Sequence, residues 1–307
     1  MEVSLFVVAF MIATLLHFGV QKLFIYYKRF DDFNHRSSHK TLATRTGGIG
    51  IFLTVLIISL YYYSQGIVLF DYSLFIPIGI MFVIGVYDDL YNADFKLKFL
   101  LQIIVAKIII DQGYVINNYY GLFGLYEVPW IIAQASTVFV FLVVVNAINF
   151  IDGIDGLAIT EVIKIVAVFE FFNTGLTALA PLGLVIISSI LPLYYFNFKK
   201  KRKVFLGDGG SMLLGTLTMV YVLYGLGNSY SFKQELIMNK TLFAVLVLLY
   251  PLIDLLRVFF LRIKEGKSPF AADNRHIHHL LLKLKLNPIL ICFLIISAEL
   301  ALITILL

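Results

Sequence analysis

Long apolar runs recur along the whole chain, and they constrain its fold more than any other feature. A helix needs about 20 mostly apolar residues to cross a bilayer, where only helices and closed barrels satisfy their own backbone hydrogen bonds. Only 14% of the 307 residues are charged, whereas a soluble protein carries about 25%. The sequence therefore predicts an all-α, polytopic membrane protein, with residues 1–307 forming a single integral-membrane domain.

We place ten transmembrane helices, and segment 114–128 leaves room for an eleventh. The ten lie at residues 3–27, 47–65, 71–87, 97–113, 129–148, 157–173, 176–197, 210–228, 240–261 and 287–306. Segment 114–128 contains aromatic residues and two glycines, which would allow a short or re-entrant helix. The first run lacks a basic start and a small-residue cleavage site, so we expect a retained helix rather than a cleaved signal.

The basic residues are sorted between alternate loops. Most of the 24 lysines and arginines lie in four stretches, at residues 28–45, 96–98, 199–203 and 262–285, while the opposite loops hold only Lys233 and Lys240. The positive-inside rule places the four basic stretches in the cytoplasm and both termini outside. The motifs described below all fall on the basic side, although ordinary turn residues would be spread over both faces. We therefore expect an active site on the cytoplasmic face.

The most distinctive stretch runs from Asn146 to Leu157 and reads NAINFIDGIDGL. Two amides and two carboxylates arrive where an uncharged span ends, at Asn146, Asn149, Asp152 and Asp155. Oxygen donors at such a turn suit Mg²⁺ or a hydrogen-bonding ligand such as a nucleobase or a sugar. The alternative is a polar turn that only caps two membrane helices, because Asn and Asp are ordinary turn residues.

Carboxylates also stand at two other cytoplasmic positions. Asp88 and Asp89 are adjacent, so that one of them can serve as a base or both can recruit a divalent metal; the alternative is a capping pair for the next helix. Asp208 lies among glycines and fits a metal ligand. The five basic residues of 199–203 that precede it are expected to set the topology.

Two basic segments are candidates for binding phosphate. One is the loop from His39 to Gly48, which includes Arg45; a flexible helix entry is the alternative. The other contains Arg275, His276, His278 and His279, where a zinc site or a plain polar loop is the alternative. Asp254 and Arg257 resemble an intrahelical ion pair, whereas Lys107, Lys164 and Glu170 are expected to snorkel or to line the bundle.

Together these motifs suit a Mg²⁺-dependent reaction of a phosphorylated substrate. No Walker-type loop is present, which argues against an ATP-driven pump. An ion-coupled transporter would need ionisable residues near the bilayer midplane and often has inverted repeats, neither of which the sequence indicates. A protein that binds a lipid or a partner without catalysis is the remaining alternative.

The motifs, in their order, resemble the polyprenyl-phosphate N-acetylhexosamine-1-phosphate transferases, which are glycosyltransferase family 4 and include the WecA/TagO/MraY group. The resemblance covers residues 39–279 and rests on these elements: Asp88-Asp89 with Asn92, the Asn146–Leu157 string, Phe205-Leu206-Gly207-Asp208 with Ser211, Pro251-x-x-Asp254 with Arg257, and Gly266 to His279. Leu42 and Thr44 replace two prolines that the family usually has in its first cytoplasmic loop.

The resemblance implies a reaction and its partners. A polyprenyl phosphate, undecaprenyl phosphate in bacteria, attacks the β-phosphate of a UDP-N-acetylhexosamine and releases UMP. Mg²⁺, or Mn²⁺ in its place, bridges the diphosphate. The resemblance also implies the bacterial inner (cytoplasmic) membrane as location, the lipid bilayer as partner, a homodimer as a family-level expectation, and no nucleic acid. The histidine segment is more similar to the WecA/TagO side, which favours UDP-GlcNAc as donor and leaves UDP-GalNAc, UDP-FucNAc and UDP-QuiNAc open.

Residue roles follow from the same resemblance. It implies that Asp208 binds the metal with Asn149, and that Asp88 is a base toward the lipid phosphate with Asp89 assisting. It further implies that Asp152 and Asp155 shape the nucleotide pocket and that Phe205 stacks on uracil. The remaining substrate-binding candidates are Arg45, Asn146, Arg275, His276, His278 and His279.

Overall fold

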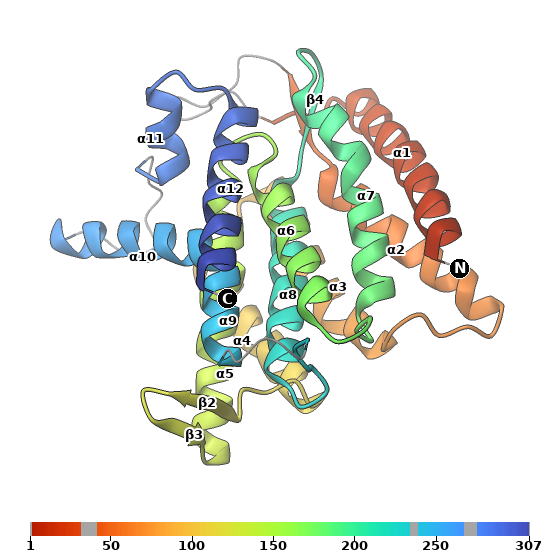
Figure 1. Ribbon diagram of the computed structural model, residues 1–307. Coiled ribbons are helices and arrows are strands. Elements are labelled where there is room, and N and C mark those ends of the chain that lie inside the picture. Colours follow the sequence, from red (N-terminus) through yellow and green to blue (C-terminus); the bar gives the residue numbers. More distant parts are fainter. Residues whose placement is uncertain (1, 32–41, 234–238, 267–274, 307) are drawn as a thin grey trace. The chain divides into compact units, whose positions relative to one another are not determined.

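The computed structural model describes residues 2–31, 42–233, 239–266 and 275–306, and it is mostly helical (Figure 1). Its helices are α1 (Glu2–Tyr26), α2 (Gly47–Ser64), α3 (Phe75–Tyr91), α4 (Phe95–Asp111), α5 (Trp130–Ile151), α6 (Leu157–Phe172), α7 (Ala180–Phe198), α8 (Gly207–Leu226), α9 (Lys240–Val247), α10 (Leu249–Lys264), α11 (Ile277–Lys283) and α12 (Pro288–Leu306), with a 3-10 turn at Tyr72–Leu74. Four short strands accompany them: β1 (Ala43–Arg45), β2 (Asn118–Leu122), β3 (Leu125–Glu127) and β4 (Lys203–Phe205).

The chain forms two compact units. The first comprises Met1–Ile108 and Gly175–Leu217, and the second comprises Ile109–Thr174 and Thr218–Leu307. The first unit therefore holds α1 to α3, α7, both strands of the β1–β4 pair and the start of α8. The second holds α5, α6 and α9 to α12. The sequence analysis predicts one membrane domain over residues 1–307, and that statement stays a prediction.

The prediction of a polytopic helical membrane protein is confirmed, but not the number of spans. Within the described residues, seven helices are long and apolar enough to cross a membrane, or up to eight if α9 and α10 count as one span. The other two expected spans correspond to α4 and α6, which have 17 and 16 residues. These lengths lie at or just below the lower limit of the ~17–25 residues with which a helix crosses a bilayer. Ten spans and their orientation stay predictions.

The ninth expected span, residues 240–261, is not one straight helix. The chain breaks at Leu248, and α9 and α10 meet at an angle of 73°. Pro251 explains the break, because a proline lacks an N–H and its ring clashes with the carbonyl four residues earlier, here that of Val247. This proline is visible in the sequence and marks the place where the expected span bends.

Segment 114–128 forms a β-hairpin, so the alternative of an eleventh helix there is wrong. Strands β2 and β3 pair antiparallel, with Asn118 opposite Glu127 and Leu122 opposite Leu125. Gly121 and Gly124 have φ of +87° and +76°, in the left-handed region that glycine enters without strain. These two glycines let the chain reverse where a helix would have required it to continue.

In the first unit, α1 packs along α7 and α2, and two short segments far apart in the sequence pair beside them. Strands β1 and β4 are parallel, with Ala43 opposite Lys203 and Arg45 opposite Phe205. The Gly48 N–H extends this pairing by donating to the Leu206 carbonyl at 2.9 Å. The N-terminal ends of α2 and α8 therefore lie next to each other, which brings Arg45 to the start of α8.

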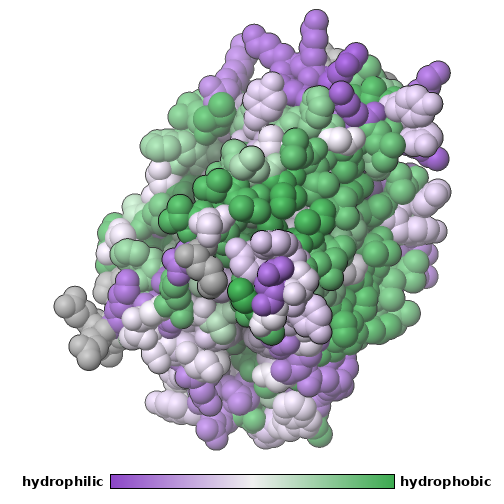
Figure 2. Space-filling view, turned by 90° about the vertical axis from the view of Figure 1, so that its right-hand side faces the viewer, coloured by the Kyte–Doolittle hydropathy of each residue, from purple (hydrophilic) through white to green (hydrophobic). Residues whose placement is uncertain are grey.

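The face of the molecule that carries α1 is broadly hydrophobic (Figure 2). Exposed apolar side chains on α1 include Val3, Met11 and Leu15, and hydrophilic residues gather toward the edges of this view. An exposed apolar helix surface of this extent suits contact with lipid rather than with water.

Candidate active site

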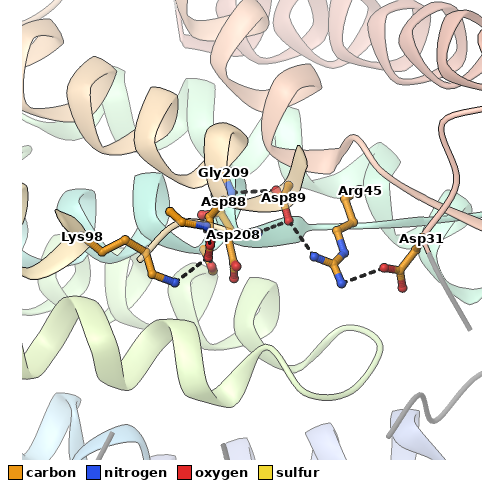
Figure 3. A network of polar contacts seen from close by, with 9 residues as sticks. Asp31, Arg45, Asp88, Asp89, Lys98, Asp208 and Gly209 are labelled. Carbon is orange, nitrogen blue, oxygen red and sulfur yellow. Dashed lines mark hydrogen bonds and ion pairs between the residues drawn. The ribbon is translucent and has the colours of Figure 1, made fainter. Parts of the chain in front are cut away.

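Three carboxylates meet in the first unit, where α3 ends and α8 begins (Figure 3). Asp88 and Asp89 lie in the last turn of α3, which stops because Asn92 turns into the left-handed region with φ of +53°. Asp208 lies in the first turn of α8. The sequence motifs around Asp88 and Asp208 are thus brought together by two helix ends, although 118 intervening residues separate Asp89 from Asp208 in the chain.

Asp89 holds the first turn of α8. Its Oδ1 accepts the Asp208 backbone N–H and its Oδ2 accepts the Gly209 backbone N–H, each at 3.0 Å. The Asp89 side chain is only 5% exposed, and Arg45 Nη1 lies 3.4 Å from its Oδ1. A carboxylate at a helix N-terminus satisfies free N–H groups and interacts favourably with the helix dipole. Asp89 therefore fixes the backbone that carries Asp208.

Asp88 faces a different set of partners. Its Oδ2 lies 2.6 Å from Lys98 Nζ and its Oδ1 accepts the Ala93 backbone N–H at 2.8 Å. Its carboxyl group is also within hydrogen-bonding reach of the Asp208 carboxyl group. Two carboxyl groups this close repel each other when both are ionised unless a cation lies nearby. Lys98 supplies one positive charge, and the pair offers hard oxygen donors for another.

This pair fits a divalent metal ion that prefers oxygen ligands. Mg²⁺ usually takes one or two protein carboxylates and completes its shell with water and substrate phosphate. Within the described ranges no group of three or more His, Cys, Asp or Glu side chains is arranged to hold a metal on its own. Asp88 and Asp208 therefore suit a metal that arrives with a phosphorylated substrate better than a permanently enclosed one.

Arg45 connects the carboxylates to a cavity. Its Nη2 lies 2.7 Å from Asp31 Oδ1. Burial alone would lower the pKa of the Arg45 guanidinium, but the carboxylates of Asp31, Asp89 and Asp208 outweigh it and raise that pKa above its usual value. Arg45 and Asp89 line a cavity of about 290 Å³ together with Lys28 and Arg29. A permanently charged guanidinium at this cavity is suited to an anionic group.

Glycine allows α3 and α8 to approach this closely. A Cβ added to Gly85 would lie 2.2 Å from the Asp208 carbonyl oxygen and 2.5 Å from the Gly209 nitrogen. These are backbone atoms that cannot swing aside. Gly85 is therefore the position in α3 that sets the distance between the two carboxylate-bearing helices.

The second unit contains the Asn146–Leu157 string. Helix α5 carries Asn146 and Asn149 and ends at Ile151, and α6 begins after Gly156, whose φ is +86°. Asp152 and Asp155 lie in the turn between them, as the sequence predicts. The Asn146 amide donates to the Leu142 carbonyl at 2.7 Å. The glycine therefore provides the sharp turn that presents the two aspartates.

The histidine segment is fastened to α10. His276 Nδ1 lies 2.7 Å from Asp254 Oδ2, and the Ile277 N–H donates to Asp254 Oδ1 at 2.7 Å. Arg257 donates to the Arg275 carbonyl at 2.6 Å. Asp254 and Arg257, expected as a pair within one helix, lie 4.0 Å apart, and each also holds the histidine segment. His276 is buried, so its main contact here is with Asp254 rather than with an open cavity.

His278 joins this segment to the Asp-Gly turn. Its Nδ1 is 3.1 Å from the Tyr250 hydroxyl, and a Cβ added to Gly153 would lie 2.4 Å from its Nε2. The His276 ring packs against Phe150 with centroids 5.8 Å apart. The structure therefore brings the histidines and the Asn146–Asp155 turn together within the second unit. Of the four predicted phosphate binders there, Arg275 and His279 are partly exposed, and His276 and His278 are buried.

The buried position of His278 predicts a pH dependence of stability. Burial, followed by the neighbouring His279, lowers its pKa to about 3. In the unfolded chain this imidazole binds a proton near pH 6.5, whereas in the folded chain it stays neutral. The free energy of unfolding therefore falls by up to about 1.4 kcal/mol for each pH unit below ~6.5. We expect the melting temperature of His278→Gln to fall less than that of the wild type when the pH is lowered from about 7 to about 5. Thermal melts in detergent check this, and parallel falls of the two proteins would contradict it.

Three residues of these sites were not singled out from the sequence for the role they have. Lys98 on α4 pairs with Asp88 on α3, and Asp31 pairs with Arg45 on β1. Tyr250 on α10 contacts His278. No spacing rule links such partners. The predicted His39 and the segment 267–274 lie outside the described residues. Asp208 belongs to the first unit and Asn149 to the second, so their pairing as metal ligands stays a prediction.

Comparison with known proteins gives a consistent result. The profile described as glycosyl transferase family 4 matches residues 72–226. The chain is 33% identical over 264 residues to an undecaprenyl-phosphate alpha-N-acetylglucosaminyl 1-phosphate transferase of Pasteurella multocida, covering 81% of this chain and 70% of that protein. Proteins of the same name from Haemophilus influenzae and Escherichia coli are 32% and 28% identical. They cover 81% and 89% of this chain, and 70% and 74% of those proteins.

Proposed function

Because the chain belongs to glycosyl transferase family 4, we propose that it transfers N-acetylglucosamine-1-phosphate from UDP-GlcNAc to undecaprenyl phosphate. UMP is the second product, and the lipid-linked diphosphosugar would start the synthesis of a glycan. The observation that carries this proposal is the close pair of Asp88 and Asp208 beside Lys98, which is suited to a metal-bound diphosphate. The names of the relatives supply the sugar and the acceptor.

The proposed reaction is a substitution at phosphorus. An oxygen of the acceptor phosphate attacks the β-phosphorus of the donor, and the bond from that phosphorus to the bridging oxygen breaks. The bridging oxygen leaves with UMP, so the electron pair of the broken bond ends on UMP. The acceptor phosphate is mostly ionised near neutral pH, so little base catalysis is needed. Asp88 would hold a metal, together with Lys98, beside the reacting phosphates, and Asp89 would act as a positioning residue for Asp208.

A metal ion fits this reaction, and we propose Mg²⁺. When bound, it would neutralise charge on the diphosphate and on the departing UMP. Asp88 and Asp208 would hold it, and Asn149 is proposed as a further ligand from the family resemblance. Arg45 would contact a phosphate group through the cavity that it lines. Phe205 is proposed to stack on uracil, and Asn146, Asp152 and Asp155 to bind the nucleotide.

The membrane arrangement is proposed from charge. Both the Asp88–Asp208 pair and the histidine segment lie near basic loops, which the positive-inside rule assigns to the cytoplasm, where UDP-sugars are made. We propose the inner membrane of a bacterium as its location, with both termini outside. A carboxylate pair at helix ends is also a poor match for an ion-coupled transporter, which needs ionisable groups near the bilayer midplane.

The assay that tests this function measures UMP release. Purified protein is given undecaprenyl phosphate, Mg²⁺ and, in separate reactions, UDP-GlcNAc, UDP-GalNAc, UDP-FucNAc and UDP-QuiNAc. We expect UMP release with UDP-GlcNAc, lost on addition of EDTA and restored by excess Mg²⁺. Release with another donor alone would replace the proposed sugar. No release with any donor from folded protein would contradict the proposed reaction.

The histidine segment is proposed to bind the donor, and His278→Ala tests this. Removing the imidazole leaves a space beside Gly153 and frees the Tyr250 hydroxyl. We expect the KM for UDP-GlcNAc to rise about tenfold, while the KM for undecaprenyl phosphate changes by less than about twofold. Initial rates of UMP release at varied donor and acceptor concentrations give both values. An unchanged donor KM and kcat would remove this segment from the donor site.

A further inference from the structure

Three charged side chains are buried together in the second unit. Lys164 on α6 has its Nζ 2.5 Å from Glu161 Oε1 and 2.9 Å from Oε2 of Glu299 on α12. All three side chains are at most 4% exposed. Of the two alternatives for Lys164, snorkelling to the membrane surface or lining the bundle, its burial excludes the first. Buried charges are costly unless they are paired and hydrogen-bonded, so a cluster of three calls for a specific use.

The cluster contacts the backbone on both sides of the break between α9 and α10. Pro251 cannot donate to the Val247 carbonyl, and Lys164 Nζ donates to that carbonyl instead, at 2.8 Å. On the other side of Leu248, the Tyr250 N–H donates to Glu299 Oε1 at 2.8 Å. The ammonium and one carboxylate thus replace hydrogen bonds at the 73° bend. Charged partners are strong enough to make such a bend a stable feature in a water-poor region.

Tyr250 links the charged cluster to the histidine segment. Its main chain is held by Glu299, and its hydroxyl lies 3.1 Å from His278 Nδ1. His278 is fully buried, and its Nε2, which has no hydrogen-bond partner among the described residues, faces Gly153. One turn further along α10, Asp254 holds His276. The direction in which α10 leaves the break therefore decides where the histidines lie over the Asn146–Asp155 turn.

We propose that Glu161, Lys164, Glu299 and Tyr250 are positioning residues that set the donor site through the helix break. The three charged residues fix the bend between α9 and α10. The bend places Tyr250, and the Tyr250 hydroxyl in turn positions His278. None of the four needs to touch the substrate for this. The proposal rests on the proposed function in one respect, namely that the histidine segment binds the UDP-sugar.

Tyr250→Phe isolates the last link, because it removes one hydroxyl and keeps the ring. We expect the KM for UDP-GlcNAc to rise about fivefold, the loss typical of one hydrogen bond, with the acceptor KM unchanged. Adding Tyr250→Phe to His278→Ala should then cause no further rise in donor KM, because the hydroxyl acts only through the imidazole. Fully multiplicative effects of the two changes, or a donor KM equal to that of the wild type, would overturn this link.

Lys164→Met and Glu299→Gln test the charged residues. Met leaves the Val247 carbonyl and both carboxyl groups without the ammonium, and we expect a rise in donor KM of at least about tenfold. In Glu299→Gln the amide oxygen can still accept the Tyr250 N–H, so we expect a smaller rise in donor KM. Glu299→Leu removes this acceptor and should raise the donor KM more than Glu299→Gln does. Lys107→Met is the matched control, since Lys107 is an exposed lysine on α4, and its donor KM should match the wild type.

The readout separates positioning from general support of the fold. A cluster that only stabilises the protein would lower the melting temperature and the amount of active enzyme while leaving the donor KM unchanged, and that result in folded variants would overturn the proposal. If Lys164→Met does not fold, the comparison of Glu299→Gln with Glu299→Leu decides. UMP release by the wild type and the effect of His278→Ala test the proposed function on their own. A failure of the proposed function can therefore be distinguished from a failure of the positioning proposal.

Discussion

Asp208→Ala is expected to lower kcat by about three orders of magnitude, because a metal held at the diphosphate supplies several kcal/mol of transition-state stabilisation. The backbone N–H of residue 208 and its contact with Asp89 remain in this variant. We therefore expect its melting temperature to stay within about 2 °C of the wild type, since the substitution removes one of two repelling carboxyl groups. UMP release and thermal melts in the same detergent measure both effects.

The control for Asp208→Ala is Asp94→Ala. Asp94 is an exposed carboxylate in the loop after α3, where it accepts the Lys96 N–H. We expect its kcat to stay within about twofold of the wild type, as for most exposed residues away from a site. A kcat for Asp208→Ala near that of Asp94→Ala would remove Asp208 from the metal site.

Asp89→Ala is expected to lose both activity and stability. It leaves two N–H groups of α8 and the Arg45 guanidinium without the carboxylate that they contact. Each buried donor left unpaired costs about 1–3 kcal/mol, so a loss of roughly 3 kcal/mol in the free energy of unfolding is expected. Because the first turn of α8 is then free to move Asp208, kcat should fall by at least about 100-fold.

Asp89→Asn provides the matched comparison. The Asn oxygen can accept one of the two N–H groups, while its own NH₂ group faces the other, so an intermediate loss of stability is expected. The pattern distinguishes two roles for this residue. Lost activity at an unchanged melting temperature in both variants would mean that Asp89 acts on the substrate directly and would contradict the anchoring role described here.

Sequence alone predicts the membrane class and the local motifs, because both depend on neighbours in the chain. Apolar length predicts helices such as α1, α5 and α12, and the Asp-Gly-x-Asp-Gly spacing predicts the turn after α5. Contacts between distant segments are different. The β1–β4 pairing joins two strands of three residues, too short to show an alternating pattern, yet it positions Arg45 at the start of α8.

The least predictable residues are those whose partners lie on other helices. Asp89 was expected to assist catalysis, and nothing in its neighbourhood indicates that its oxygens accept the N–H groups of Asp208 and Gly209 in the first turn of α8. Lys164 was expected to snorkel or to line the bundle. Glu161 lies three residues earlier on the same helix, but the other carboxylate partner, Glu299, lies on α12, 135 residues later in the chain. Pro251 was the one local signal of the break, and its consequence depends on what satisfies the Val247 carbonyl.

The central claim is that the β-phosphate of the donor moves together with its sugar. The most direct test uses UDP-GlcNAc carrying a radiolabel at the β-phosphorus, with undecaprenyl phosphate, Mg²⁺ and purified protein. The label should enter the lipid fraction in step with the appearance of unlabelled UMP, and Asp208→Ala should show neither. Label recovered in soluble UDP, with only the sugar in the lipid, would contradict the proposed transfer of a sugar phosphate.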